Sequence, residues 1–208
     1  MPHLLDPKFV KLVSALPVAD HRVEVQAADW AERCTQAGCL HLHTLLFAGR
    51  TAVQISRDWL HHAKISPELR CFAILLWGYP HGARGHERHW LAHLPAIAAT
   101  AAAPATSWEN YSARLRSHGH LGLFTISKLA CFFGHVYHRL PALILDQRIV
   151  GVLQAGQWAE LLRFQPITST NASESYLGYL DCLHTLAAKT HTQGEQWEMF
   201  LFMFGEAF

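Results

Sequence analysis

The sequence predicts an all-α protein with about ten helices. Apolar residues recur at helical spacing along most of the chain, whereas alternating strand patterns are scarce, and Arg22–Gln26 is the best candidate for a strand. The chain has 208 residues, half of them hydrophobic, which suits one substantial core. We therefore expect a single helical domain over residues 1–208, with a length that also allows two lobes.

Four helices are predicted before the Gly- and Pro-rich segment 78–85, which reads as a loop. They share apolar residues at helical spacing, and all but the third have a proline, glycine or serine at one end. Their ranges are Pro7 to Pro17, Ala27–Ala37, Thr51–Ala63 and Ser66–Trp77. The body of the last one, Leu69–Trp77, is almost wholly apolar, so we expect a buried central helix.

The second half of the chain continues the helical pattern. Pro95 is a potential break in the first of these segments, and the small residues of Ala98–Thr106 predict a linker. Gly119 and Gly122 mark a turn, after which Lys128 opens an apolar helix. The predicted helices are Glu87–Thr100, Trp108–Arg116 capped by Ser107, the helix of Lys128, Gln147–Leu153 capped by Asp146, Asn171–Ala188 and Glu195–Phe204.

Charge and cysteine content exclude several classes of protein. The formal net charge is +1, which neither favours nor excludes nucleic-acid binding, although sixteen histidines can add local positive charge. The five cysteines are scattered and lack the paired spacing of zinc or iron–sulfur sites, and the histidine pairs lack a HExxH pattern. We therefore expect no metal and no cofactor. The absence of a signal peptide and of a long apolar run predicts a reduced, cytoplasmic protein without a membrane partner.

Lys128 and Asp146 are the residues most suggestive of chemistry. They lie eighteen positions apart, and a short helix, a Pro-containing turn and a second helix start would bring both side chains to one cleft. Apolar neighbours of Lys128 predict partial burial, and burial disfavours an ammonium and makes a lysine a better nucleophile. On spacing alone, a solvated lysine and a helix-capping aspartate are the more common interpretation.

Two stretches around these residues carry a resemblance to a known family. Ser127-Lys128-Leu129-Ala130, followed by Leu143-Ile-Leu-Asp146-Gln-Arg148-Ile-Val150, resembles the helix-hairpin-helix DNA glycosylases, in particular the bacterial branch with an 8-oxoguanine-glycosylase-like fold. The closing segment Tyr176–Phe202 is similar to that branch as well, so the resemblance covers the chain from about residue 107. It places the hairpin at about 107–155. The two glycines usual before the lysine are replaced here by Phe124 and Ile126.

The resemblance implies base excision. Lys128 would attack the sugar C1′ of a flipped nucleotide and form a Schiff base, while Asp146 supports the charged sugar. It implies a double-stranded DNA partner carrying a modified base, no iron–sulfur cluster, and a monomer. It assigns DNA-backbone contacts to Gly122, Thr125 and Ser127 of the hairpin and to Arg148, for which a surface arginine is the alternative. Two basic groups in the sequence could also follow a phosphate backbone or be solvated loops, and they contribute Arg84, Arg116, His118 and His120. The candidate walls of the base pocket, each of which is more commonly a core residue, are Phe132, Trp197, Phe200, Phe204 and Trp77.

The substrate stays open at this point. Oxidised guanine is the family's usual target, and a hypermodified or glucosylated phage cytosine, excised in anti-phage defence, is the second class. The resemblance leaves strand nicking at the abasic site open too. A non-catalytic helix-hairpin-helix DNA-binding module is the alternative function, although the presence of both Lys128 and Asp146 disfavours it.

Overall fold

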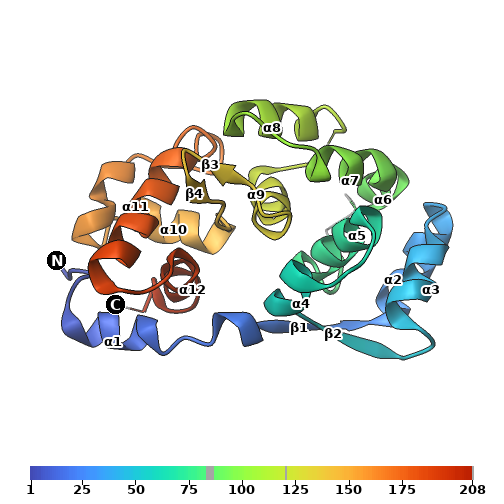
Figure 1. Ribbon diagram of the computed structural model, residues 1–208, viewed down its shortest axis with the longest axis horizontal. Helices are drawn as coiled ribbons and strands as arrows, with labels where there is room; N and C mark the ends of the chain where they lie inside the picture. The colour runs from blue at the N-terminus through green and yellow to red at the C-terminus, as the bar shows by residue number, and fades with distance from the viewer. Residues whose placement is uncertain (83–86, 120, 208) are drawn as a thin grey trace. The chain divides into compact units, whose positions relative to one another are not determined.

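The computed structural model describes residues 1–82, 87–119 and 121–207 (Figure 1). The chain divides into two compact units. One unit joins Met1–Val18 to Val136–Phe208, and the other is Ala19–His135. Regular structure in the described residues is mostly helical, with two short pairs of antiparallel strands, which confirms the predicted all-α class.

The unit Ala19–His135 is built around α5, Pro67–Gly78, whose residues Cys71–Trp77 are all buried. The buried central helix expected at Leu69–Trp77 is therefore confirmed. Helix α5 packs against α7, α9, α3 and β1. The elements around it are β1 (Arg22–Gln26), α2 (Ala27–Gln36), α3 (Leu40–Phe47), β2 (Ala52–Ser56), α4 (Arg57–His62), α6 (Glu87–Ala92), α7 (Leu94–Ala102), α8 (Trp108–Arg116) and α9 (Leu123–Phe132).

The other unit packs around α12, Gly194–Phe204, which contacts α1, α10 and α11. Its aromatic core contains Phe9, Trp158 and Phe200, with ring centroids 4.9 to 5.8 Å apart. The remaining elements are α1 (Pro7–Ser14), β3 (Val136–Tyr137), β4 (Leu140–Pro141), α10 (Gln147–Ala155), the 3-10 helix η2 (Ala159–Phe164) and α11 (Tyr176–Thr190). A short 3-10 helix, η1, covers Val18–Asp20. None of the described helices is long and apolar enough to cross a bilayer.

The helix predicted over Thr51–Ala63 is wrong in its first half. Ala52–Ser56 forms strand β2, which pairs antiparallel with β1, and only Arg57–His62 is helical. The alternation of buried Val53 and Ile55 with more exposed neighbours fits a strand, and both side chains are β-branched. The strand predicted at Arg22–Gln26 is confirmed, and it provides the partner that decides the conformation of β2.

Other element boundaries also differ from the prediction. The predicted linker Ala98–Thr106 is wrong over its first residues, because α7 continues to Ala102. Alanine favours the helical conformation, and the burial of Ala98 and Ala101 stabilises the helix further. The segment Glu87–Thr100 is broken at His93, and Pro95, the potential break, lies in the first turn of α7. Helix α11 begins at Tyr176, five residues later than the predicted Asn171. Helix α3 was not predicted.

Arg70 ties the ends of two helices to α5. Its guanidinium donates to the carbonyl oxygens of Leu60 at 2.6 Å, His61 at 3.0 Å and Ala63 at 2.6 Å, where α4 ends. The same group donates to the Phe132 carbonyl at 3.4 Å, at the end of α9. Helix C-terminal carbonyls lack intrahelical partners, and a cation there also complements the helix dipole. Burial lowers the pKa of Arg70 from its usual value.

We predict that Arg70→Met lowers the free energy of unfolding by about 2–3 kcal/mol, because it leaves several carbonyl groups without a donor. Urea unfolding measures the change. Arg22→Met is the matched control, since Arg22 is exposed in the same unit and its loss is expected to cost less than about 0.5 kcal/mol. Equal effects of the two substitutions would contradict the anchoring role of Arg70.

Candidate active site

Lys128 lies in the second half of α9 with its side chain packed against the protein. It is the sixth residue of the helix and does not open it, which corrects the sequence prediction. The residue is 5% exposed, and Nζ donates to the carbonyl oxygen of Phe124, one turn earlier, at 3.4 Å. The expected burial is thus observed. A Cβ added to Gly78 would lie 3.2 Å from Lys128 Cδ and 3.4 Å from Cε, so this glycine leaves the space that the lysine fills.

Three consecutive residues at the end of α5 shape the surroundings of Lys128. Gly78 is flanked by Trp77, whose ring meets that of Phe132 edge to face at 5.3 Å. On the other side, the Tyr79 hydroxyl and Thr125 Oγ1 share a hydrogen bond of 2.9 Å. One contact lies a turn after Lys128 and the other just before it on α9, so the end of α5 fixes the helix on both sides of the amine.

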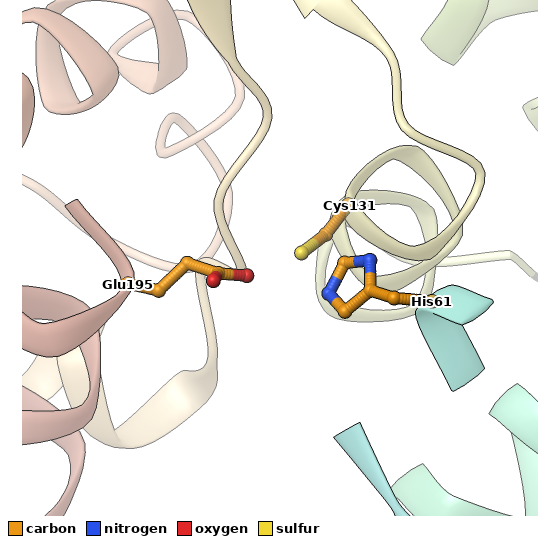
Figure 2. Close-up of side chains that lie close together, drawn as sticks. All are labelled: His61, Cys131 and Glu195. Atoms are coloured by element: carbon orange, nitrogen blue, oxygen red, sulfur yellow. The ribbon is translucent and has the colours of Figure 1, made fainter. Parts of the chain in front are cut away.

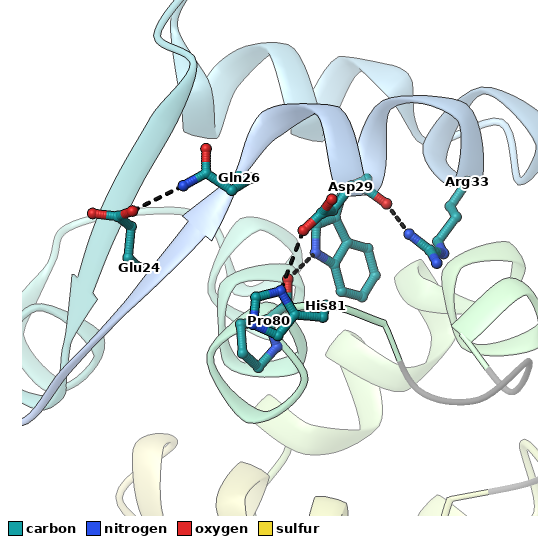
Figure 3. A network of polar contacts seen from close by, with 7 residues as sticks. Glu24, Gln26, Asp29, Arg33, Pro80 and His81 are labelled. Atoms are coloured by element: carbon teal, nitrogen blue, oxygen red, sulfur yellow. Dashed lines mark hydrogen bonds and ion pairs between the residues drawn. The ribbon is translucent and has the colours of Figure 1, made fainter.

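The chain beyond Tyr79 is anchored to α2 (Figure 3). Trp30 Nε1 donates to the carbonyl oxygen of Pro80 at 3.0 Å. His81 Nδ1 lies 3.4 Å from Asp29 Oδ2, and Arg33 donates to the Asp29 carbonyl within α2. These contacts fix the path of the chain as it leaves α5, and thereby support the position of Gly78 beside the lysine.

Helices α8 and α9 pack together as a helical hairpin, and Lys128 lies in its second helix. Ser107 caps α8, as predicted, by accepting from the amide of Asn110 at 3.2 Å. Gly119 adopts φ +78 in the connecting turn, and an added Cβ would lie 2.9 Å from His89 Nε2, so both conformation and space require glycine. Gly122 is exposed at the start of α9. Two orphan backbone amides, those of Leu123 and Phe124, follow it and have no hydrogen-bond partner among the described residues.

Asp146 belongs to the other unit, at the start of α10. Its Oδ1 accepts from the amide of Arg148 at 3.2 Å, which confirms the predicted helix cap. The buried segment before it is held through its backbone: the Glu198 carboxylate accepts from the Ile144 amide at 2.7 Å. Tyr179 donates to the Ile144 carbonyl at 2.9 Å, and Tyr176 donates to the Leu143 carbonyl at 2.6 Å.

A largely buried cluster lies between α4 and the end of α9 and was not found from the sequence. Arg57 is 2% exposed, with its guanidinium 5.8 Å from the Phe132 ring and Nη2 3.9 Å from Cys131 Sγ. Potential ligand atoms of His61 and Cys131 lie within 4.8 Å of each other (Figure 2). Glu195, drawn in the same figure, is part of the other unit. The pair His61–Cys131 provides two ligands, fewer than the three or four protein ligands of a zinc site, so by itself it is no metal centre.

Comparison with protein families decides what kind of protein this is. Residues 16–202 match the model of the family described as "Putative 8-oxoguanine DNA glycosylase OGG-like protein". The chain belongs to this OGG-like family. No curated protein and no solved structure matches the chain. The family agrees with the resemblance inferred from the segments around Lys128 and Asp146, and the match extends well before residue 107.

Within this member of the OGG-like family, the expected DNA contacts differ in accessibility. Arg116 and Arg148 are exposed, and the Arg148 guanidinium lies 5.0 Å from the Phe202 ring. By contrast, Thr125 and Ser127 are 2% and 0% exposed, so their side chains are buried and only backbone groups of this stretch are suited to a phosphate. The ring of His118 bonds Thr100 Oγ1 at 2.8 Å. Arg84 and His120 lie outside the described residues.

The residues expected to line the base pocket also differ in burial and in their ring contacts. Trp197 and Phe200 are fully buried, and Phe200 packs in the aromatic core of its unit, which corrects their assignment to a pocket. The two rings also contact each other edge to face, with centroids 5.9 Å apart. Phe204 is half-buried against Phe200 at 6.0 Å. Trp77 and Phe132 are buried as well and contact each other, and they lie in the same unit as Lys128.

We predict that Glu198→Leu destabilises the fold by about 2–3 kcal/mol, because the buried amide of Ile144 loses its acceptor. Glu198→Gln retains an oxygen acceptor of the same reach, so its cost is expected to be smaller. Chemical denaturation of the two variants provides the comparison. If Gln and Leu destabilise equally, the hydrogen bond to Ile144 does not hold the segment before Asp146.

Proposed function

We propose that the protein is a DNA glycosylase that excises a damaged or modified base through a lysine Schiff base and leaves an abasic site. The observation that carries the proposal is the amine of Lys128, buried on α9, the helix that follows the α8–α9 turn, in a member of the OGG-like family. Burying an ammonium group costs free energy, so the burial of Lys128 points to a functional role for its amine. Nucleophilic attack by an amine is such a role.

In the proposed reaction the target nucleotide is flipped out of the duplex before chemistry. The uncharged Lys128 Nζ attacks C1′, and the glycosidic bond breaks with its electron pair leaving on the base, which takes up a proton. Loss of an amine proton and opening of the sugar ring then give the Schiff base. Water hydrolyses it to release the lysine and an abasic site. β-Elimination from the same intermediate would nick the strand.

Asp146 is proposed to stabilise the positive charge that develops on the sugar ring. A carboxylate is suited to this role, since electrostatic stabilisation of transition-state charge is among the strongest contributions to enzyme catalysis. The residue is half-buried, and the segment before it is fixed by Glu198 and Tyr179. A carboxylate held on a rigid support loses little energy to reorganisation during the reaction.

DNA binding is proposed to use the α8–α9 turn. The orphan amides of Leu123 and Phe124 at the start of α9 are donors for a phosphate oxygen, and the dipole of a helix favours an anion there. The exposed guanidinium of Arg116, at the end of α8, adds a cation on the same hairpin. Arg148 is proposed as a further backbone contact on α10.

The substrate is proposed to be either 8-oxoguanine or a phage-type hypermodified base such as glucosylated hydroxymethylcytosine, the second implying anti-phage defence. Duplexes carrying oxidised, alkylated, deaminated or phage-type bases, scored for abasic sites, discriminate between them. The alternative function is a DNA-binding module without catalysis. Borohydride reduces a Schiff base to a stable cross-link, so a glycosylase of this type is trapped on its DNA and a binding module is not.

We predict that Lys128→Gln abolishes the borohydride cross-link and lowers base excision by roughly 10³-fold or more, because the nucleophile is lost. Gln has a similar length and no charge, so the fold is expected to persist. Binding to a duplex with an abasic-site analogue serves as the control and is expected to stay within a few-fold of wild type. An unchanged yield of cross-link in the variant would assign the nucleophile to another residue.

We predict that Gly78→Ala slows cross-linking about tenfold without loss of stability. The added methyl group would push on Lys128 Cδ and Cε, and small misplacements of a reacting group are costly. Alanine is meanwhile a better helix former than glycine by about 1 kcal/mol. The readouts are the single-turnover rate of trapping and the thermal midpoint of unfolding.

Gly178→Ala is the matched control for this prediction, since Gly178 is a glycine of α11 whose added Cβ makes only an ordinary contact, 3.5 Å from Phe164. It is expected to leave trapping unchanged. A Gly78→Ala protein that traps DNA at the wild-type rate would show that the contact with Lys128 has no catalytic consequence.

A further inference from the structure

The β3–β4 hairpin has a strained tip. Val136 pairs with Pro141 and Tyr137 with Leu140, which leaves His138 and Arg139 as a two-residue turn. Both have positive φ, +50 and +69. A two-residue turn with positive φ at both positions is of type I′, for which Asn-Gly is strongly preferred because side chains of L residues are crowded in this region. The sequence therefore departs from the favourable choice at both positions.

No local contact explains this departure. The described residues contain four non-glycine residues with positive φ, and two of them, Ala48 and His191, end α3 and α11 as left-handed caps. His138 and Arg139 cap no helix. Both are exposed, and within the described part of the chain neither side chain forms a hydrogen bond or an ion pair. The strained turn therefore carries two side chains, His138 and Arg139, that make no stabilising polar contact within the described residues.

The base of the hairpin is firmly held. Tyr137 is 3% exposed and its ring packs at 6.4 Å against that of Tyr176 on α11. His184, also on α11, donates from Nε2 to the carbonyl oxygen of Pro141 at 2.9 Å. The tip is therefore presented from a rigid base, as a binding residue requires.

We propose that the His138–Arg139 turn binds the DNA backbone, with the Arg139 guanidinium on a phosphate of the duplex and the His138 side chain beside it. This inference rests on the proposed function, because it takes the duplex on which the glycosylase acts as the ligand. An exposed guanidinium without an internal partner matches phosphate geometry bidentately. Backbone strain that no internal contact explains is typical of binding sites, where the interaction with a ligand offsets its energetic cost.

Nearby acidic charge does not cancel this cation. Asp181 lines the same surface hollow as His138 and Tyr137. Its carboxylate is paired with Arg163, whose Nη2 lies 3.4 Å away. The field at the tip is therefore left positive enough to attract a phosphate.

The test measures binding to a short duplex carrying a tetrahydrofuran abasic-site analogue, by fluorescence anisotropy over a series of salt concentrations. Arg139→Gly and the double variant His138→Asn with Arg139→Gly are expected to bind about tenfold more weakly. The slope of log Kd against log salt concentration is expected to fall by about 1, as for loss of one phosphate contact. Their Tm values are expected to rise by about 2–4 °C because the turn is relieved.

Two further variants separate the causes. Arg139→Gln removes the cation and keeps the strain, so it is expected to weaken binding without raising Tm. Lys11→Gln removes one exposed positive charge from α1 of the same unit and is expected to change Kd less than about twofold, since it lies outside the proposed contact.

Wild-type affinity and salt slope in the Arg139 variants would overturn the proposed contact, as would an equal loss of affinity in Lys11→Gln. A fall of Tm in the Gly variants would overturn the claim that the turn is strained. A wild-type protein that binds no duplex and forms no borohydride cross-link would instead refute the proposed function from which the inference starts.

Discussion

The packing of α5 against α9 is the constraint on which the candidate site depends. Residues Cys71–Trp77 of α5 are apolar and buried on all sides, and the helix meets α9 near both of its ends. Near its start, Arg70 reaches the carbonyl oxygen of Phe132. At its end, Gly78 and Tyr79 meet Lys128 and Thr125. Because these contacts come from one rigid helix, the position of the lysine along α9 and its depth in the unit are set together.

Burial of Lys128 follows from the division of its side chain into an apolar stem and a polar end. The methylenes fill the space beside Gly78, which favours burial by the hydrophobic effect, while Nζ keeps a hydrogen bond to the Phe124 carbonyl. In the proposed reaction this amine attacks a substrate carbon, so the packing of α5 that positions the lysine stem also positions the proposed nucleophile.

Much of the fold could be predicted because the deciding signals are local. Ser107 and Asp146 cap the helices predicted for them, and the apolar run Leu69–Trp77 is the buried helix. Strand β2 was missed because its conformation depends on pairing with β1, which is distant in sequence. The site was less predictable for the same reason: local sequence pointed to Lys128, but the role of Gly78 depends on residues brought together by folding. Aromatic residues near the C-terminus could serve either core or pocket, and the packing of Phe200 among core rings shows which one applies.

At two places in this chain, a simple substitution would be expected to increase the stability of the fold. Gly78 stands at the end of a helix without a positive φ, where alanine is intrinsically better. His138 and Arg139 occupy a turn that Asn-Gly would relieve. Departures of this kind concentrate where function opposes stability, because natural sequences are otherwise locally consistent with their fold. One of them lies against the proposed nucleophile and the other presents the exposed cation proposed to bind a phosphate. The local cost in each case therefore coincides with a proposed function that the fold alone does not require.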